Sequence, residues 1–257
     1  MRGHKEHGIL LAALLLGLFC LPGCDKDKNK GKDKEKEKPK PAEPAKKEEA
    51  AKPDPEGWVS IFDGKTFKNW KDSDYPSQPK PRIENGTLIL PAGQPLTGVT
   101  YTGKDVPKMN YEISVEAQLV DGSDFFCAIT FPVAESFASL VCGGWGGSVT
   151  GISSLDGNDA ANNETARMIT YEKDKWYHFE VRVVETRLKA WIDGKEIVNA
   201  NTRDRKVETR WEMDSCHPFG LASYYTTGAI KDIKVRKLND QEIEKEKQEA
   251  EKDKDKE

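Results

Sequence analysis

Residues 142–159, CGGWGGSVTGISSLDGND, are the least ordinary stretch of the chain. Glycines on both sides of Trp145 let the backbone approach a ligand closely, and the indole ring offers a flat apolar face. Sugar rings stack on such faces. The alternative is a glycine-rich turn between strands whose tryptophan fills the core. Trp145 is therefore a candidate for ligand binding.

Oxygen-bearing side chains follow in the same stretch. Asp156, Asn158 and Asp159 surround Gly157, and they have the chemistry to contact hydroxyl groups or to ligate a hard cation. A solvated turn explains them as well. Arg167 is a candidate for binding a carbonyl or carboxylate group, or else a surface residue.

Acid–base chemistry has further candidates. Asp124 precedes a predicted strand, and Glu112 and Glu116 alternate outward on another; each is a base if burial raises its pKa. His217 lies in a polar loop, where its ring can titrate near neutrality, and Trp211 is close to it in sequence. The candidate catalytic residues are Asp124, Asp156 and His217. The candidate substrate-binding residues are Trp145, Asn158, Arg167 and Trp211.

Strands are the elements that must position these side chains. In residues 111–119 and 177–183 apolar and polar side chains alternate, which is the period of strands with one buried face. Asp193-Gly194 is a hairpin signal. Many short strands separated by turns, without a long amphipathic helix in residues 57–238, predict an all-β sandwich or jelly roll of two antiparallel sheets. A closed barrel is the alternative.

The cysteines and histidines of this region restrict covalent and metal chemistry. Cys127, Cys142 and Cys216 allow at most one disulfide, for which Cys127 and Cys142 on neighbouring strands are the natural pair; three buried thiols are the alternative. Only His178 and His217 are available, so a zinc site is disfavoured.

The N-terminal residues have the order of a secretory signal. Arg2 and Lys5 precede an apolar run at 9–19, which is followed by Leu-Pro-Gly-Cys at 21–24. The run is too short for a transmembrane helix, which needs about 20 apolar residues. We therefore expect residues 1–23 to be a signal peptide and the protein to be exported.

Both flanks of the domain are charged and poor in large apolar residues. Residues 24–56 interleave lysines with acids and cannot form a core, so they are predicted to be a disordered tether. Residues 239–257 are predicted to be a solvated tail that is helical at most in part. Residues 57–238 remain as one domain of nearly balanced charge, which argues against a nucleic-acid partner.

Two segments resemble known families. Residues 21–24 are similar to a bacterial lipobox, which implies acylation of Cys24 and an anchor in the cell envelope; an ordinary signal peptide is the alternative. Residues 58–70, WVSIFDGKTFKNW, resemble the opening signature of the 3-keto-disaccharide hydrolase family. Residues 83–88, 110–113, 176–181, 191–195 and 228–237 match later blocks of that family.

The resemblance implies a concanavalin A-like jelly roll that acts on 3-keto sugars. A keto group at C3 acidifies the hydrogen on C2, so that a base can remove it and expel the group on C1 before water adds back. Such chemistry needs a general base, a proton donor and a positive group or hydrogen-bond donors for the enolate. The family resemblance also implies a divalent metal as a possible cofactor.

The sequence departs from the family in the middle of the domain. Members carry an arginine at the end of a small-residue strand, and residues 124–132 contain none. The resemblance predicts an extracytoplasmic enzyme that cleaves or eliminates 3-keto glycosides. The alternatives are a non-catalytic glycan-binding module and a scaffolding lipoprotein. A cleft lined by Trp145 and at least two carboxylates would exclude the scaffolding alternative.

Overall fold

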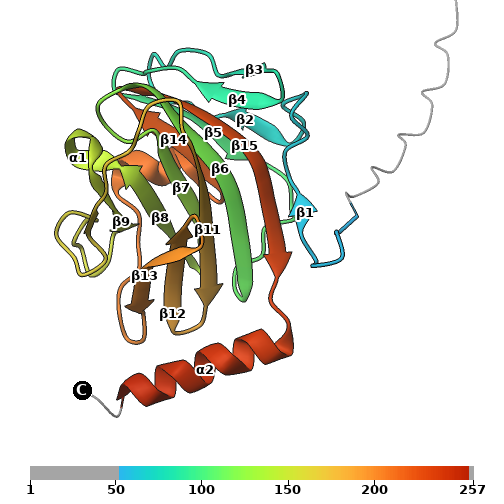
Figure 1. Cartoon of the computed structure of the whole chain (residues 1–257), viewed down its shortest axis with the longest axis vertical. Helices are drawn as coiled ribbons and strands as arrows, with labels where there is room; N and C mark the ends of the chain where they lie inside the picture. Colours follow the sequence, from blue (N-terminus) through green and yellow to red (C-terminus); the bar gives the residue numbers. More distant parts are fainter. Residues whose placement is uncertain (1–51, 255–257) are drawn as a thin grey trace, which may run out of the picture. The chain divides into compact units, whose positions relative to one another are not determined.

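Two antiparallel sheets pack face to face and form the domain (Figure 1). The computed structural model describes residues 52–254; the predicted signal peptide, Cys24 and most of the predicted tether lie outside them. The prediction of an all-β sandwich is confirmed. None of the helices between residues 52 and 254 is both long and apolar enough to cross a bilayer.

The first sheet, called the A sheet, carries the strands with the most regular alternation. Its spatial order is β13 (Lys195–Asn201), β12 (Arg187–Ile192), β11 (Trp176–Val184), β6 (Tyr111–Gly122), β15 (Thr226–Lys237), β4 (Thr87–Leu90) and β3 (Arg82–Glu84), and β1 (Val59–Ser60) pairs with β15. Its central strand β6 pairs with β11 and β15, which are far apart from it in sequence, so the fold depends on long-range pairing as well as on consecutive hairpins.

The second sheet, called the B sheet, carries the glycine-rich segment. Its order is β10 (Arg167–Met168), β9 (Val149–Ser153), β8 (Ser136–Gly143), β7 (Cys127–Val133), β14 (Gly220–Tyr224), β5 (Leu96–Tyr101) and β2 (Trp70–Asp72). The helical segments are α1 (Gly144–Gly147), the 3₁₀ helix η1 (Trp211–Cys216) and α2 (Asp240–Lys254).

The main core lies between the two sheets. On β11, Phe179, Val181 and Val183 are fully buried in it, while the residues between them face outward. On β7, Cys127 and Ile129 belong to the same core. Each sheet therefore keeps an outer face that is free to carry other side chains.

The three cysteines of the domain are free and buried. Cys127 and Cys142 are direct partners across β7 and β8, as expected from their positions on neighbouring strands, but they remain thiols. Burial raises the pKa of the Cys142 thiol well above its ordinary value, and its neighbour Cys127 adds to the shift. The alternative of three buried thiols is the one the structure supports.

The C-terminal segment is more ordered than a solvated tail. Asn239 and Glu242 form a capping box at the start of α2: the Asn239 side chain accepts from the Glu242 N–H at 2.9 Å, and the Glu242 side chain accepts from the Asn239 N–H at 2.9 Å. Figure 1 shows α2 lying across one end of the A sheet. Glu246 and Ala250 on the helix are buried.

Ion pairs, rather than an apolar face, hold α2 to the sheet. The Glu246 carboxylate lies 2.7 Å from Arg182 on β11 and 2.7 Å from Lys189 on β12. Glu112, on the outer face of β6 as expected, is buried between Arg182 and Arg236 rather than exposed to solvent. Hydropathy alone gave no sign of this docking, because its contacts are between charges.

Candidate functional site

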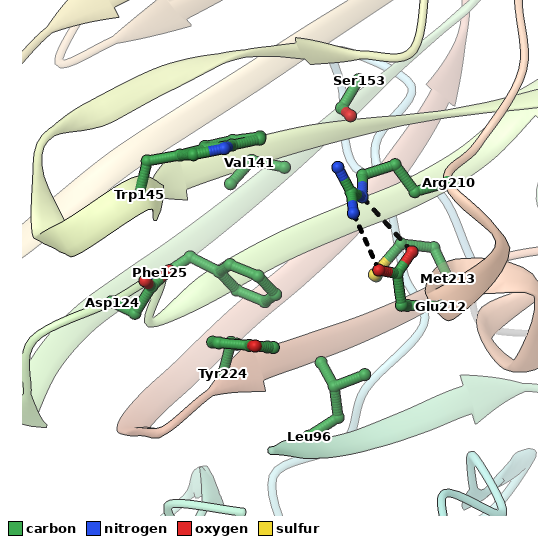
Figure 2. A pocket seen from close by; sticks show the side chains of 10 residues that line it. All are labelled: Leu96, Asp124, Phe125, Val141, Trp145, Ser153, Arg210, Glu212, Met213 and Tyr224. Atoms are coloured by element: carbon green, nitrogen blue, oxygen red, sulfur yellow. Dashed lines mark hydrogen bonds and ion pairs between the residues drawn. The ribbon is translucent and has the colours of Figure 1, made fainter. Parts of the chain in front are cut away.

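A cleft lies on the outer face of the B sheet. The strands expose small and apolar side chains there, and η1 crosses them with Met213 and Cys216 packed against Ala128, Val141 and Ala222. The helix covers only part of the face. The uncovered part is a cavity of about 210 Å³, shown in Figure 2 and lined by Leu96, Asp124, Phe125, Val141, Trp145, Ser153, Arg210, Glu212, Met213 and Tyr224.

Aromatic rings form two sides of the cleft. In Figure 2 the Trp145 indole lies on one side and the rings of Phe125 and Tyr224 lie on the other. The centroids of Phe125 and Tyr224 are 5.5 Å apart with planes tilted by 32°, so the two rings together make a broad apolar surface. Trp145 is 40% exposed, and it is not the core plug that was the alternative interpretation.

The glycine-rich segment presents Trp145 through a left-handed backbone. Gly143, Gly146 and Gly147 all have positive φ, and Trp145 itself has φ 50° and ψ 53°. A bulky residue costs energy in this region, where glycine is favoured. A tryptophan held there is consistent with a side chain kept for what it contacts.

Asp124 fastens the turn that carries Trp145. One of its carboxylate oxygens accepts from the Phe125 N–H at 2.8 Å and the other accepts from the Gly146 N–H at 3.1 Å. Its own N–H donates to Thr226 on β15 at 2.9 Å. Asp124 therefore lies in the cleft as expected, and these contacts make it a positioning residue.

The charged end of the cleft contains Arg210 and Glu212, at the start of η1. The Arg210 guanidinium donates to Glu212 at 2.9 and 3.3 Å and to Asp159 at 3.0 Å. Burial raises the pKa of Glu212, but hydrogen bonding and the charge of Arg210 outweigh it, so the pKa lies below the ordinary 4.5. Glu212 is thus an ionised carboxylate at neutral pH.

Ser153 at the end of β9 brings an unpaired polar atom to the same cleft. Its side chain is buried, and its hydroxyl has no hydrogen-bond partner within residues 52–254. A buried hydroxyl without a partner is costly, so it is a natural contact for a polar ligand.

Five of the seven expected site residues lie outside the cleft lining. Asp156 pairs with Arg205 at 2.7 Å, and that hydrogen bond holds the pKa of the Asp156 carboxyl below its ordinary value. Asn158 is an exposed turn residue, and Arg167 donates only to backbone carbonyls of its own segment. Trp211 is 78% exposed on η1 and does not line the cleft, although it is next in sequence to the cleft residue Glu212.

His217 is also outside the cleft lining. Its ring stacks on Phe137 with centroids 3.9 Å apart, and its Nε2 lies 3.0 Å from the Thr209 hydroxyl. Burial lowers the pKa of His217 below 6.5, and Asp214 opposes that shift only in part. The ring is neutral at pH 7 and packs under the end of η1.

The residues that sequence reasoning missed are Arg210, Glu212, Ser153, Phe125 and Tyr224. Arg210 and Glu212 flank Trp211, so the signal available was a cation and an acid on either side of a tryptophan in a loop. That loop crosses a sheet whose strands come from distant segments of the chain. The alternation of apolar and polar residues that predicts strands gives no information about where such a loop lies.

A divalent metal, implied by the family resemblance, finds no suitable set of ligands in the described chain. Residues 52–254 contain no group of three or more His, Cys, Asp or Glu side chains arranged to hold one. Of the two acids that line the cleft, Asp124 is engaged by backbone N–H groups and Glu212 by Arg210, which also engages Asp159 outside the lining.

Solved structures resemble the domain at low sequence identity. A Crh5 transglycosylase in complex with NAG has a TM-score of 0.50 at 9% identity, over 71% of this chain and 85% of that chain. The carbohydrate binding module CBM66 from Bacillus subtilis has a TM-score of 0.45 at 12% identity, over 65% and 95%. The laminarinase from Flavobacterium sp. UMI-01 has a TM-score of 0.42 at 13% identity, over 67% and 94%.

At these identities the likeness to the transglycosylase shows a common fold and no more. No curated protein matches the chain. A family model does: the 3-keto-alpha-glucoside-1,2-lyase-like domain matches residues 57–236, which is almost the whole of the domain predicted from the sequence. The chain therefore belongs to the family of the 3-keto-alpha-glucoside-1,2-lyase-like domain.

Proposed function

We propose that the cleft binds one ring of a 3-keto glycoside and cleaves its bond at C1. The observation that carries the proposal is the position of the Arg210–Glu212 pair, which lies in a cleft walled by aromatic rings in a member of this family. Asp124 and Glu212 are two carboxylates lining the cleft with Trp145. This arrangement argues against a scaffolding protein without sugar chemistry.

The size and lining of the cleft support a single sugar ring as the bound unit. Its volume of about 210 Å³ is below the roughly 300–1,000 Å³ of sites for drug-sized ligands. The apolar faces of a pyranose suit Trp145 on one side and Tyr224 on the other, while the Ser153 hydroxyl is available for a sugar hydroxyl. The group on C1 would extend from the open mouth.

Glu212 has the best chemistry for the general base. It is ionised, it lines the cleft, and its carboxylate does not hold the Trp145 turn as that of Asp124 does. Glu212 takes the proton from C2, and the C–H electron pair becomes the C2–C3 double bond of an enolate whose charge rests on the keto oxygen. As the keto group re-forms, the C1–C2 double bond forms and the C1–O bond breaks.

Water is the only other reactant that the catalytic cycle needs. The leaving oxygen takes the proton back from Glu212, and water then adds across C1–C2, with hydroxide on C1 and a proton on C2. The products are the freed alcohol and the 3-keto sugar, and Glu212 is again a carboxylate. The net change is hydrolysis of the glycoside.

Non-catalytic carbohydrate binding is the second candidate function. Arg210 and Glu212 satisfy each other's charge at 2.9 Å, so neither needs a substrate to be stable. The aromatic walls alone are sufficient for stacking on a sugar ring. This alternative predicts binding that depends on Trp145 and no bond cleavage.

Turnover of a chromogenic 3-keto glucoside tests the proposal. The purified protein is expected to release the phenol and 3-keto-glucose, and Glu212→Gln is expected to lower kcat by about 100- to 10,000-fold, the usual contribution of a general base. Glu84→Gln is the matched control, because Glu84 is also the acid of an Arg-x-Glu pair, with Arg82 on the A sheet. Release that is absent from the wild type across a panel of 3-keto glycosides would reject cleavage and leave binding.

We also propose that the protein is exported and anchored by lipid at Cys24, on the basis of residues 1–24. The charged residues that follow would then be a tether between the membrane and the sugar-binding domain. Mass spectrometry of the N-terminal peptide from native membranes is expected to show an acylated Cys24. An unmodified peptide that begins elsewhere would contradict the anchor.

A further inference from the structure

The Arg210 guanidinium stands between two carboxylates at the charged end of the cleft. We infer that Arg210, rather than a bound divalent cation, is the positive group that binds the keto oxygen and stabilises the enolate. The inference rests on the proposed function and assigns its electrophile.

The hydrogen bonds of Arg210 leave donors for a ligand. A guanidinium has five N–H groups in a fixed fork. Nε and Nη2 donate to Glu212 at 3.3 and 2.9 Å, and Nη1 donates to Asp159 at 3.0 Å. Each terminal nitrogen carries a second N–H, and 44% of the side chain is exposed where it lines the cleft. One N–H group on each terminal nitrogen is therefore left for a ligand.

The same contacts disfavour a metal at this position. The two carboxylates nearest to the guanidinium are the oxygen ligands that a hard cation would need, and both already hold Arg210. A divalent cation there would meet a positive charge at contact distance and would have to displace it. The other acid that lines the cleft, Asp124, holds the Trp145 turn through Gly146.

The backbone under Arg210 is firmly placed although the side chain is partly exposed. Arg210 is the residue before η1, and η1 is fixed by the burial of Met213 and Cys216 against the B sheet. The Cys216 sulfur also lies 3.2 Å from the Tyr75 hydroxyl. Electrostatic stabilisation of an enolate requires such a preorganised donor.

The test measures turnover of the chromogenic 3-keto glucoside by the wild type after dialysis against EDTA, and again with Mg²⁺, Mn²⁺, Ca²⁺ or Zn²⁺ added. We expect equal kcat/KM in all conditions. Arg210→Ala is expected to lower kcat by about 100-fold or more, with partial recovery on adding guanidinium but none with urea or a metal. Arg82→Ala, in the other Arg-x-Glu pair, is the control and should match the wild type.

The pH profile of Arg210→Ala separates direct from indirect action. Removing Arg210 raises the pKa of Glu212, because the arginine is what holds it low. If Arg210 only tuned Glu212, turnover by the variant would return to the wild-type plateau at higher pH, and the inference would be wrong. A plateau that stays low at every pH supports direct contact with the keto oxygen.

Other outcomes also decide the matter. Loss of wild-type turnover on chelation, with recovery on adding one metal, would overturn the inference and leave the proposed function intact. A wild type that is inactive in every condition would reject the proposed function, and the inference with it. The near-UV circular dichroism and Tm of Arg210→Ala show whether the variant is folded, and the chelation test needs no variant.

Discussion

The outer faces of the two sheets both carry arginine–glutamate pairs, but the pairs differ in how completely they are satisfied. On the A sheet, Glu246 is 2% exposed and is held by Arg182 and Lys189 beneath α2. On the B sheet, Arg210 and Glu212 are 44% and 23% exposed, and they border an open cavity with N–H donors to spare.

This difference separates a structural network from a candidate site. Under α2 the buried acids Glu112 and Glu246 each contact two cations, Arg182 and Arg236 for Glu112 and Arg182 and Lys189 for Glu246. The hollow beside them is lined by Trp58 and Trp191, and each of these rings already has a cation over it. These cations are Arg182 over Trp191 and Arg236 over Trp58. In the cleft, by contrast, the charges share a cavity with Trp145, and there we propose that the same chemical groups contact a ligand.

The largest effect on stability is expected at Glu246. Breaking a buried ion pair by removing one partner costs about 3–5 kcal/mol when the remaining charge stays buried. Here α2 can leave the sheet and expose Arg182 and Lys189 to water. We therefore expect Glu246→Ala to lower the free energy of unfolding by no more than deletion of residues 240–257 does, as measured by urea denaturation.

Glu244→Ala is the control for the helix, because Glu244 is exposed on α2 and bonds only to Gln248. Its effect should stay within about 0.5 kcal/mol. A loss in Glu246→Ala that exceeds the loss on deletion would mean that the helix stays docked over unpaired charges. Both variants should retain turnover, because the cleft is on the other sheet. A loss of turnover would show that the docking of α2 and the cleft are coupled.

The strands of the fold were predictable because the alternation of apolar and polar residues that marks them is local and periodic. Alternation in residues 111–119 and 177–183 anticipates β6 and β11 and their buried faces. The docking of α2 was not predictable from hydropathy, because a glutamate such as Glu246 is expected to face solvent on an amphipathic helix. Its burial depends on cations from strands 64 and 57 positions earlier in the chain, Arg182 and Lys189.

The candidate site was predictable only where composition is unusual. Trp145 among glycines and Asp124 before its strand were found from the sequence, and both line the cleft. Arg210 and Glu212 were not found, because a short 3₁₀ helix carries them across strands to which no sequence period links it. His217 attracted interest as a histidine in a polar loop, but stacking on Phe137 accounts for it.

A moderate effect is expected at Trp145, and it concerns binding. Removing the indole should raise KM or Kd for the sugar by about 10-fold, or roughly 1.4 kcal/mol. Because Trp145 has φ 50°, Trp145→Gly should be more stable than Trp145→Ala by about 1 kcal/mol, the reverse of the order in a regular strand. Isothermal titration calorimetry and thermal unfolding of the two variants measure both quantities.

The two variants should weaken sugar binding equally while Trp145→Gly is the more stable of the two. This result would show that the indole side chain contributes to binding and that the left-handed backbone at position 145 contributes strain. Unchanged affinity for the sugar in both variants would show that Trp145 does not contact the ligand. The proposed difference between the outer faces of the two sheets would then lose its support.

The smallest effect is expected from His217, as pH falls from 6.5 toward 4.5. Burial holds the pKa of His217 in the folded protein below its unfolded value of 6.5, so the unfolded state binds the proton more tightly. The free energy of unfolding should therefore fall as pH decreases below 6.5, until the folded histidine is protonated as well. His217→Gln should remove this slope, as followed by urea denaturation at several pH values.

Turnover should not follow the same curve. Glu212 must be ionised, and its pKa lies below 4.5, so kcat/KM should hold steady through the range in which stability declines and drop only at lower pH. Stability and turnover would then report two different groups on one face of the B sheet. An inflection of kcat/KM below pH 6.5 that disappears in His217→Gln would instead assign the acid–base chemistry to His217.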